Sequence, residues 1–350
     1  MDGKALILCE RAFGDVNGKT AHGLVRSTQR YEIIGVIDSQ LAGRDAGEVL
    51  SGRPNQIPIF ASLSEALAKA TAPPAYLVIG LAPEGGELPP AYREVVMEAL
   101  RHGLNVDSGL HQFLSEDPHL EQLAARSGAA IRDVRKPLPR KKLHFFSGAI
   151  QKVQAVRVAI LGTDSAVGKR TTATLLTEEL NRSGTPAVLI GTGQTAWMQG
   201  VRYGIILDSI VNDFVAGELE HAVVEADRNE SPRVIIIEGQ GCLTHPAFPG
   251  GFEIMAATRP RGVILQHAPG RTTYAGYPDY PLAPPEVHIQ AIDLLFGSRV
   301  VALALNHEGI NREAVGTTAA ELERRYALPC CDPIEQGTQR LADAVRALLS

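Results

Sequence analysis

GTDSAVGKRTT, residues 162–172, decides the fold of the C-terminal half of the chain. The glycine that ends the apolar run VRVAILG is followed after five residues by Gly168 and Lys169, one residue more than in the usual pattern G-x-x-x-x-G-K, and then by a segment with leucines at helical spacing. Such a strand, loop and helix bind phosphate because the backbone N–H groups of the loop and the N-terminus of the helix face the anion. We therefore predict a phosphate-binding loop that consists of Gly162, Thr163, Asp164, Ser165, Ala166, Val167, Gly168, Lys169, Arg170 and Thr171.

The residue after the loop lysine departs from the usual pattern. Arg170 stands where Ser or Thr normally supplies the hydroxyl that binds Mg²⁺. Three readings stay open: Thr171 or Thr172 replaces that hydroxyl, Asp164 or another carboxylate holds the ion, or no metal is needed because the phosphates are only anchored. A phosphoryl group that is transferred needs Mg²⁺ to neutralise developing charge, whereas a diphosphate that is bound without reacting does not. The sequence therefore favours a site without a metal.

Short apolar runs alternate with amphipathic segments along both halves of the chain. In the first half, strands are expected at residues 5–9, 32–38, 76–79 and 104–107, with helices at 18–27 and 94–101. In the second half, strands are expected at 156–161, 187–190, 234–237, 262–265 and 300–305, with helices at 170–181, 208–227, 285–295, 312–325 and 338–349. This alternation predicts parallel sheets that are covered on both faces. The expected fold class is α/β, with an N-terminal Rossmann-like parallel sheet domain (residues 1–135) and a C-terminal P-loop NTPase-like doubly wound domain (residues 153–350).

A basic segment, residues 136–152, separates the two predicted domains. It overlaps the basic stretch DVRKPLPRKKLHFFSGAI (133–150), which contains prolines and shows no clear period. These properties are typical of a linker. Its cationic residues leave a second reading open, a strap beside a bound anion; they are Arg135, Lys136, Arg140, Lys141 and Lys142.

The composition indicates a globular protein without a basic surface. The formal net charge is −5, and because nucleic acids and anionic membranes usually bind basic surfaces, neither is expected as a partner. No apolar run approaches the ~20 residues of a membrane helix, and the start MDGKALILCE has too short an apolar core for a signal peptide, which favours a cytoplasmic location. The four cysteines form no C-x-x-C pair, so buried free thiols are expected. A homodimer or higher homo-oligomer is the general expectation for such a protein.

Glu238 is the main catalytic candidate. It closes the buried strand of VIIIEGQG (234–241), and in a parallel sheet the carboxyl ends of the central strands face the bound ligand. Glu238 would act there as a general base or as a metal-positioning acid. A helix N-cap is the structural alternative.

Three further loops follow predicted strands, so their polar side chains should meet at the same edge of the sheet. The loops are GTGQTAWMQG (191–200), QGCLTHPAF (240–248) and LQHAPGRTTYAGYP (265–278). His245 and His267 are candidates for proton transfer at neutral pH. Arg271 suits bidentate binding of a carboxylate. The other residues that we expect to bind substrate are Gln194, Gln240, Thr244 and Tyr274.

The segment DSIVNDFVAGELE (208–220) opens with two acidic residues. Asp208 is predicted to be a helix N-cap. Asp213 lies beside apolar residues and is a fourth catalytic candidate, with a purely structural position as the alternative. Asn306, after the strand VVALAL, is either a ligand contact for a purine edge or a turn residue.

The N-terminal half contains a near miss to the same loop pattern. Residues 14–20 read G-x-x-x-G-K-T, one residue too short for a phosphate-binding loop, and the half has no G-x-G-x-x-G. Asp38 closes the second predicted strand, where a dinucleotide fold places its ribose-binding acid. The sequence favours a Rossmann-like domain with a structural role; NAD binding and substrate or subunit contacts remain alternatives.

Several of these motifs together resemble one protein family. They are GTDSAVGKRTT, QTAWMQG, VNDFVAGELE, EGQGCLTHP and LQHAPGR, with AGRDAG (42–47) and GLAPEGGELPP (80–90) in the first half. The family is long catalogued as of unknown function, its members are often labelled as NAD-dependent epimerase- or dehydratase-like, and one branch is D-glutamate N-acetyltransferase. The resemblance covers about residues 5 to 340.

The resemblance implies a fold and an activity. The fold is a Rossmann-like N-terminal domain with a P-loop C-terminal domain similar to dethiobiotin synthetase. The activity is transfer of an acetyl group from acetyl-CoA to the amine of D-glutamate, ahead of oxidation by a partner dehydrogenase. The loop at residues 162–171 would then anchor the phosphates of CoA, Glu238 or a nearby histidine would be the base, backbone N–H groups around residues 239–241 would stabilise the oxyanion, and Arg271 would hold a glutamate carboxylate.

Three other functions compete with acetyl transfer. The first is an ATP- and Mg²⁺-dependent ligase or kinase that acts on a carboxylate substrate, similar to dethiobiotin synthetase, with Mg²⁺ held by Thr171 and Glu238. The second is a nucleotide-binding switch or chaperone without chemistry of its own. The third is NAD-linked chemistry through Asp38.

Overall fold

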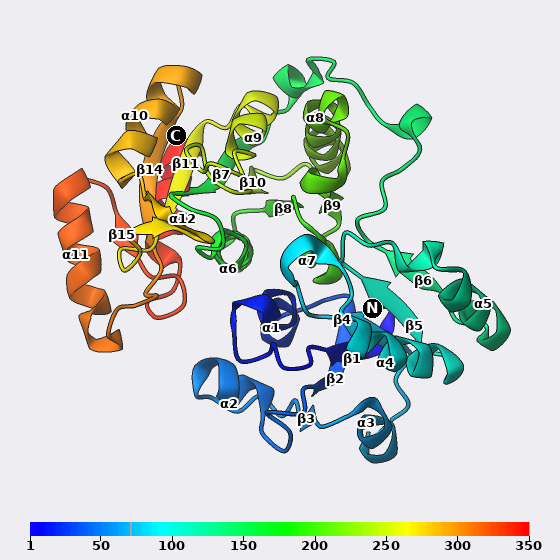
Figure 1. Cartoon of the computed structure of the whole chain (residues 1–350). Coiled ribbons are helices and arrows are strands. Elements are labelled where there is room, and N and C mark those ends of the chain that lie inside the picture. Colours follow the sequence, from blue (N-terminus) through cyan, green and yellow to red (C-terminus); the bar gives the residue numbers. More distant parts are fainter. Residues whose placement is uncertain (71, 350) are drawn as a thin grey trace. The chain divides into compact units, whose positions relative to one another are not determined.

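The computed structural model describes residues 1–70 and 72–349, and the chain divides into two compact units. The N-terminal unit consists of Met1–Pro137 together with Gln194–Val201, and the C-terminal unit consists of Leu138–Gly193 and Arg202–Ser350. Residues 71 and 350, which fall within the two predicted domains, lie outside the described residues. Both units are α/β, as the sequence predicts (Figure 1).

The N-terminal unit is built on a parallel sheet with the order β3-β2-β1-β4-β5-β6. This is the doubly wound order of Rossmann folds, in which the direction of winding reverses beside the first strand. Its strands are β1 (Gly3–Leu8), β2 (Tyr31–Ile37), β3 (Ile59–Phe60), β4 (Tyr76–Ile79), β5 (Asn105–Ser108) and β6 (Ile131–Asp133). Its helices are α1 (Lys19–Arg26), α2 (Ala46–Ser51), α3 (Leu63–Lys69), α4 (Pro90–Arg101) and α5 (Pro118–Ser127).

A short excursion from the second half of the chain completes this unit. After β8 the chain forms α7 (Gln194–Met198), which belongs to the N-terminal unit. The ring of Trp197 lies 3.8 Å from the guanidinium of Arg30 and 5.3 Å from that of Arg132, and the hydroxyls of Thr195 and Thr20 are 3.1 Å apart. The QTAWMQG motif is therefore an integral part of the N-terminal unit.

The C-terminal unit contains a parallel sheet with the order β15-β14-β11-β7-β10-β8-β9. Its strands are β7 (Val156–Gly162), β8 (Ala187–Gly191), β9 (Tyr203–Gly204), β10 (Val234–Glu238), β11 (Gly262–His267), β14 (Arg299–Leu305) and β15 (Cys330–Cys331). An antiparallel hairpin, β12 (Thr273–Tyr274) and β13 (Tyr277–Pro281), follows β11. Its helices are α6 (Lys169–Arg182), α8 (Asn212–Glu230), α9 (Gly251–Thr258), α10 (Pro285–Phe296), α11 (Val315–Tyr326) and α12 (Gln339–Arg346).

Helices cover both faces of this second sheet. Successive residues of β7 point to opposite faces, so Ala159 and Leu161 join the apolar cluster under α8, α9, α10 and α11, whereas Val158 and Ile160 join the cluster under α6 and α12. Burial on both faces explains the continuous apolar runs of the sequence. Strand β7 pairs with both β10 and β11, so the carboxyl ends of the three strands lie side by side.

The segment between the units is anchored by two glutamates of α8. Glu218 accepts hydrogen bonds from the backbone N–H of His144 and from its ring, and Glu220 accepts from the backbone N–H groups of Ser147 and Ile150. The basic residues 138–152 are thus part of the C-terminal unit.

One local prediction was wrong. Asp208 does not cap α8, because it lies in a 3-10 turn at Leu207–Ser209, and α8 begins at Asn212 after Val211, whose side chain makes no capping hydrogen bond. The prediction of buried free thiols is confirmed for Cys9, Cys242, Cys330 and Cys331.

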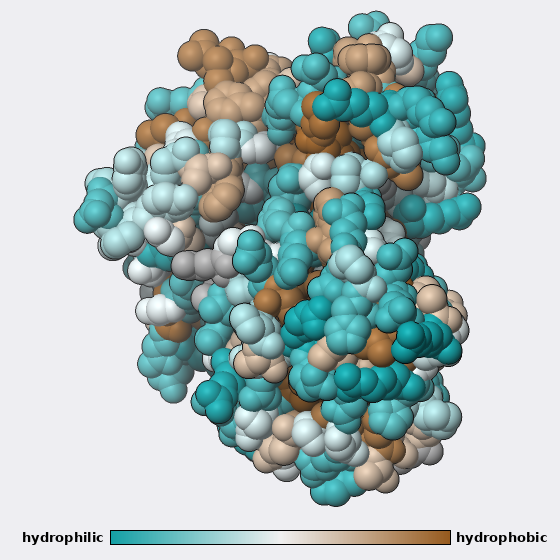
Figure 2. Space-filling view, turned by 45° about the vertical axis from the view of Figure 1, so that its right-hand side comes forward, coloured by the Kyte–Doolittle hydropathy of each residue, from teal (hydrophilic) through white to brown (hydrophobic). Residues whose placement is uncertain are grey.

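The face shown in Figure 2 is mostly hydrophilic, with scattered apolar areas. The large apolar side chains that are exposed include Phe145 of the connecting segment and Leu294 and Leu295 of α10. Within residues 1–70 and 72–349, no helix combines the length and the apolar character that crossing a membrane requires.

Candidate active site

The loop that joins β7 to α6 has the backbone shape that its glycines and its short side chains permit. Gly168 adopts a φ of +102° and Ala166 a φ of +51°, both in the left-handed region, which costs a non-glycine residue energy unless neighbours hold it there. A Cβ at Gly162 would come within 3.1 Å of the Lys169 side chain and 3.0 Å of the Asp164 carbonyl oxygen. The first glycine of the motif thus allows the loop to fold closely over the lysine.

Four consecutive carbonyl groups of this loop accept hydrogen bonds from side chains. The Asp164 carbonyl accepts from Lys169 Nζ at 2.7 Å, the Ser165 and Ala166 carbonyls from Arg271 at 2.8 and 3.3 Å, and the Val167 carbonyl from Asn306 Nδ2 at 2.7 Å. Asn306 therefore contacts the loop itself. Among the described residues, the structure shows no acceptor for the N–H groups of Ala166, Val167 and Gly168. This arrangement leaves backbone donors for an anion at the start of α6.

Lys169 is enclosed by the loop that it follows. Its side chain is only 6% exposed, and burial lowers the pKa of its ammonium to about 8, against the nearby Cys242, Asp164 and Glu238, which act in the opposite direction. A Cβ at Gly239 would approach the Lys169 side chain to 3.0 Å and the Ile160 carbonyl oxygen to 2.1 Å. A glycine after Glu238 is therefore required for the lysine to lie between the ends of β7 and β10.

The hydroxyl groups after the lysine differ in what they contact. Thr172 is buried and donates to Gln266 Oε1, so its hydroxyl already has a partner, whereas Thr171 is only half-buried. Arg170 occupies the usual hydroxyl position and is near enough to lower the pKa of the Glu238 carboxyl. Among the residues that the structure describes, no group of three His, Cys, Asp or Glu side chains is arranged to hold a metal ion.

Glu238 lies at the carboxyl end of β10, beside the phosphate-binding loop. It is 4% exposed, and burial raises the pKa of its carboxyl above the usual value, against the charge of Arg170 and the hydrogen bond from Thr192. The backbone N–H of Thr192 donates to Glu238 Oε2 at 2.8 Å, and the Thr192 hydroxyl donates to the Glu238 carbonyl at 3.1 Å. Strand β8 thus fixes the carboxylate through Thr192. A carboxyl group with a raised pKa is suited to accept a proton near neutral pH.

The backbone that follows His245 orients its ring. Its Nδ1 accepts from the backbone N–H groups of Ala247 and Phe248, at 3.1 Å each, so the proton lies on Nε2. Nε2 is 3.5 Å from Asp164 Oδ1, and among the described residues it has no hydrogen-bond partner. Burial lowers the pKa of His245, which keeps the ring neutral.

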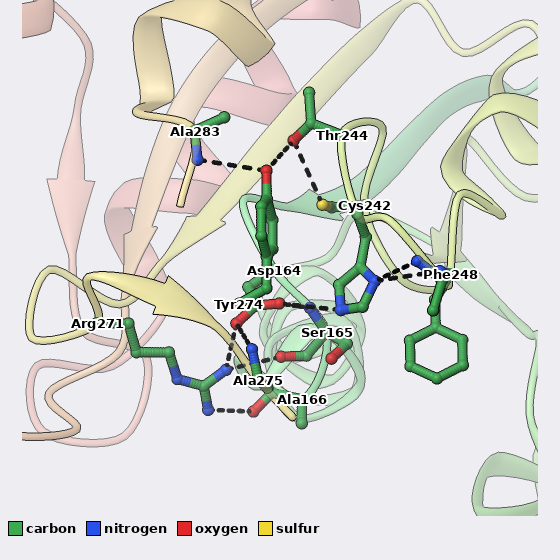
Figure 3. A network of polar contacts seen from close by, with 12 residues as sticks. Asp164, Ser165, Ala166, Cys242, Thr244, Phe248, Arg271, Tyr274, Ala275 and Ala283 are labelled. Carbon is green, nitrogen blue, oxygen red and sulfur yellow. Dashed lines mark hydrogen bonds and ion pairs between the residues drawn. The ribbon is translucent and has the colours of Figure 1, made fainter. Parts of the chain in front are cut away.

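A chain of polar contacts links the hairpin to α10. The Ala283 N–H donates to the Tyr274 hydroxyl at 3.3 Å, and Tyr274 donates to Thr244 Oγ1 at 2.7 Å (Figure 3). Thr244 Oγ1 lies 3.2 Å from His288 Nε2, and burial lowers the pKa of His288 to about 4. Sequence reasoning missed His288, because a single histidine on a helix carries no recognisable signal.

His267 lies at the end of β11, directly behind the loop. Its Nδ1 is 2.9 Å from Thr163 Oγ1, and burial lowers its pKa to about 4. The preceding residue, Gln266, accepts the Thr163 N–H with its carbonyl and the Thr172 hydroxyl with its side chain. Gln266 was also missed, although its place before His267 at a predicted strand end was a usable signal.

Arg271 has a contact for each of its five N–H groups. It donates to the Asp164 carboxylate at 2.8 Å and to the Ser165 and Ala166 carbonyls (Figure 3). It also donates twice to the Glu308 carboxylate, at 2.9 and 2.6 Å. The carboxylate oxygen that accepts from Arg271, Asp164 Oδ2, also accepts the Ala275 N–H at 3.0 Å. The guanidinium therefore joins the phosphate-binding loop to the loop after β14.

The remaining predicted residues lie in different places. Gln240 follows Glu238, and its amide is near Gly193. Gln194 begins α7 in the N-terminal unit, where it contacts Gly109. Asp213 is exposed in the first turn of α8 and is outside the network around Asp164. The structure thus gathers Glu238, His245, His267, Thr244, Tyr274 and Arg271 at one edge of the second sheet, and the roles of all these residues stay predictions.

The sheet order, the loop after β7 and the enclosed lysine define a doubly wound α/β protein with a P-loop. The chain belongs to the DUF1611 family. The family model described as "Domain of unknown function (DUF1611_C) P-loop domain" matches residues 144–342, and the one described as "Domain of unknown function (DUF1611_N) Rossmann-like domain" matches residues 39–137. The family resemblance and the fold that the sequence predicts are both confirmed.

Similar proteins cover most of the chain. A D-glutamate N-acetyltransferase of Tritonibacter scottomollicae is 32% identical over 78% of this chain and 81% of its own length. A D-glutamate N-acetyltransferase of a Pseudoalteromonas species is 28% identical over 75% of this chain and 79% of its own length. The crystal structure of a DUF1611 family protein from Anabaena variabilis superposes with a TM-score of 0.89, with 32% identity and coverage of 98% of this chain and 99% of that one.

Proposed function

We propose that the protein is an N-acetyltransferase that transfers the acetyl group of acetyl-CoA to the amino group of D-glutamate. Its support is twofold: two relatives named D-glutamate N-acetyltransferase match three quarters or more of the chain, and the site combines an anion-binding loop with a buried carboxylate. The substrate is a small amino acid, and no nucleic acid or membrane takes part in the reaction.

The observation that carries the proposal is the hydrogen bonding of the phosphate-binding loop. Side chains hold the carbonyls of residues 164–167, and the N–H groups of residues 166–168 have no acceptor among the described residues. Lys169 adds a positive charge, and Arg170 replaces the hydroxyl that normally holds Mg²⁺. CoA carries a diphosphate that only has to be anchored, and such an anchor needs donors and positive charge. The loop therefore holds the donor substrate, while the reaction takes place at neighbouring strand ends.

Acyl transfer requires a base close to the attacking amine. In this proposal Glu238 accepts a proton from the ammonium group of glutamate, and the free amine attacks the thioester carbonyl carbon. The tetrahedral intermediate then collapses with loss of the CoA thiolate, which takes up the proton that the new amide releases. Backbone N–H groups at residues 239–241 and the His245 Nε2–H are the candidate donors for the oxyanion. Gln240, Gln194, Thr244 and Tyr274 stay the predicted contacts for the substrate.

The assembly and location of the enzyme complete the proposal. We propose a cytoplasmic homodimer or larger homo-oligomer, supported by the exposed leucines of α10 and by the general frequency of symmetric dimers. Light scattering coupled to size exclusion measures the assembly state.

A substrate comparison tests the reaction. Purified protein receives acetyl-CoA with D-glutamate, L-glutamate or D-aspartate, and thiol release is followed with and without EDTA; a parallel reaction offers ATP, Mg²⁺ and each acid and follows phosphate release. We expect thiol release with D-glutamate that EDTA leaves unchanged. ATP consumption that EDTA abolishes, without thiol release, would replace this proposal with the ATP-dependent ligase or kinase.

A further inference from the structure

Arg271 joins three parts of the C-terminal unit. It lies in the loop between β11 and β12, and its side chain is only 13% exposed. One edge of the guanidinium contacts Asp164, Ser165 and Ala166 (Figure 3). The other edge contacts Glu308, two residues after the Asn306 that donates to the Val167 carbonyl. All five N–H groups are in use, so a substrate carboxylate would have to displace one of these contacts.

We propose that Arg271 is a positioning residue, which holds the phosphate-binding loop in its anion-binding shape, and that Glu308 orients the guanidinium for this task. Arg271 then acts on the phosphate-bearing donor substrate, and the glutamate carboxylates are bound elsewhere. This inference rests on the proposed function for the identity of the donor, acetyl-CoA.

The direction of the loop carbonyls is the first reason. In a peptide unit the carbonyl and the N–H point in opposite directions, so a carbonyl that is fixed on the outside of the loop turns the following N–H toward the inside. Arg271 holds the carbonyls of Ser165 and Ala166, and therefore orients the N–H groups of Ala166 and Val167, which belong to the same two peptide units. These are two of the three loop donors for which the described residues provide no acceptor.

The left-handed backbone of Ala166 is the second reason. An alanine at a φ of +51° is strained, and surrounding contacts must hold such a residue in place. The hydrogen bond from Arg271 to the Ala166 carbonyl is a contact of this kind. Without it we expect the residue to relax toward a negative φ, which would rotate its neighbouring N–H groups away from the anion.

The buried charge of Asp164 is the third reason. The Asp164 carboxylate is fully buried, and a buried carboxylate requires a paired cation and hydrogen bonds. Arg271 supplies the cation, and the backbone N–H groups of Ser165 and Ala275 supply further donors. A lysine would pair with the charge, but it lacks the planar fork that reaches two carbonyls and two carboxylates together.

The test separates the Michaelis constants of the two substrates. Arg271→Lys and Glu308→Gln are compared with Arg312→Lys, a control whose exposed guanidinium contacts Glu335 away from the loop. We expect the KM for acetyl-CoA to rise about tenfold in Arg271→Lys and about threefold in Glu308→Gln, because charged hydrogen bonds are lost. The KM for D-glutamate and the control should change less than about twofold. A rise in the KM for D-glutamate with an unchanged KM for acetyl-CoA overturns the inference.

A binding measurement makes the inference independent of the activity. Inorganic pyrophosphate, titrated calorimetrically into the unmodified protein and into Glu308→Gln, reports the loop alone. We expect the variant to bind pyrophosphate about threefold more weakly at an unchanged melting temperature. Equal binding of pyrophosphate by both proteins contradicts the inference, whether or not the unmodified protein transfers acetyl groups. Absence of acetyl transfer, with weaker pyrophosphate binding by the variant, contradicts only the proposed function.

Discussion

The loops after β1 and after β7 each follow the first strand of a parallel sheet, yet they use their backbone groups differently. In the N-terminal unit, the loop after β1 buries Phe13 and donates the Phe13 N–H to Asp38 at 3.1 Å, while the Gln40 N–H donates to the same carboxylate at 3.0 Å. In the C-terminal unit, side chains hold the loop carbonyls, and the N–H groups of residues 166–168 are left without acceptors among the described residues. In the first loop the Asp38 carboxylate already occupies a backbone donor, whereas in the second the donors of residues 166–168 are left for an anion.

The difference shows that strand order alone does not make a binding site. Both sheets present a loop and a buried acid at the carboxyl ends of neighbouring strands, Asp38 after β2 and Glu238 at the end of β10. Lys19 is exposed at the start of α1, whereas Lys169 is buried at the start of α6. The second loop has two more residues between its glycines than the first, and this length together with the glycines allows its lysine to be enclosed. We therefore expect matched substitutions in the two units to have very different effects on catalysis.

The two buried acids give the largest expected contrast. Glu238→Gln keeps the shape of the side chain but removes its ability to take a proton, so kcat should fall by about 10²–10⁴-fold. The KM for acetyl-CoA should stay within about twofold, because the loop is intact. Steady-state kinetics with both substrates measures the change, with Asp38→Asn as the matched control, for which kcat should be unchanged. A decrease below about threefold in Glu238→Gln would remove Glu238 from the role of base.

The two lysines give the next contrast. Lys169→Ala removes the buried ammonium at the start of α6, and the KM for acetyl-CoA should rise by about 10–100-fold, as expected for the loss of charged hydrogen bonds to phosphate. Lys19→Ala should change the KM less than about twofold. Equal effects of the two substitutions would mean that the donor is not anchored by the loop after β7.

The pH dependence of donor binding should reflect Lys169. Burial lowers the pKa of this ammonium to about 8, so the side chain is charged below about pH 8 and neutral above it. Phosphate binding favours the charged form, and the KM for acetyl-CoA should therefore rise above about pH 8, by up to about tenfold per pH unit, until the contribution of the lysine is lost. The measurement is the KM at saturating D-glutamate from pH 7 to 9.5, and the rise should be absent from Lys169→Ala.

Much of the fold follows from the sequence, because its signals are local. The strand expected at residues 76–79 is β4 (Tyr76–Ile79), and the helix expected at 170–181 is α6 (Lys169–Arg182). Strands of two or three residues, such as β3 and β15, have no period of their own and form only because a neighbouring strand is already in place. The start of α8 was misplaced because Asp208 suggested a cap and the chain instead makes a 3-10 turn first.

The candidate site could be predicted only in part. The loop at residues 162–171 is contiguous, so its pattern is readable, and Glu238 is marked by its place at a strand end. The side chains that hold the loop come from elsewhere: Arg271 from the loop after β11 and Asn306 from the loop after β14. Their contacts depend on the tertiary fold, and a sequence shows only that such residues are polar and near strand ends.

Asp38 gives the smallest expected effect on catalysis, because it stabilises the N-terminal unit. Asp38→Ala leaves the buried N–H groups of Phe13 and Gln40 without their acceptor, which should lower the free energy of unfolding by about 1–3 kcal/mol. Trp197 is the only tryptophan of the sequence and belongs to this unit, so its fluorescence during urea unfolding reports the loss. We expect an earlier fluorescence transition with kcat and both KM values unchanged.

The same variant decides whether the first loop binds a dinucleotide. A ribose-binding acid needs free carboxylate oxygens, and both oxygens of Asp38 already accept backbone hydrogen bonds. NAD titrated into the unmodified protein should therefore give no binding heat. Binding of NAD that Asp38→Ala abolishes would show that the loop after β1 opens to admit a ligand. The loops after β1 and after β7 would then both be ligand-binding loops, against the comparison made above.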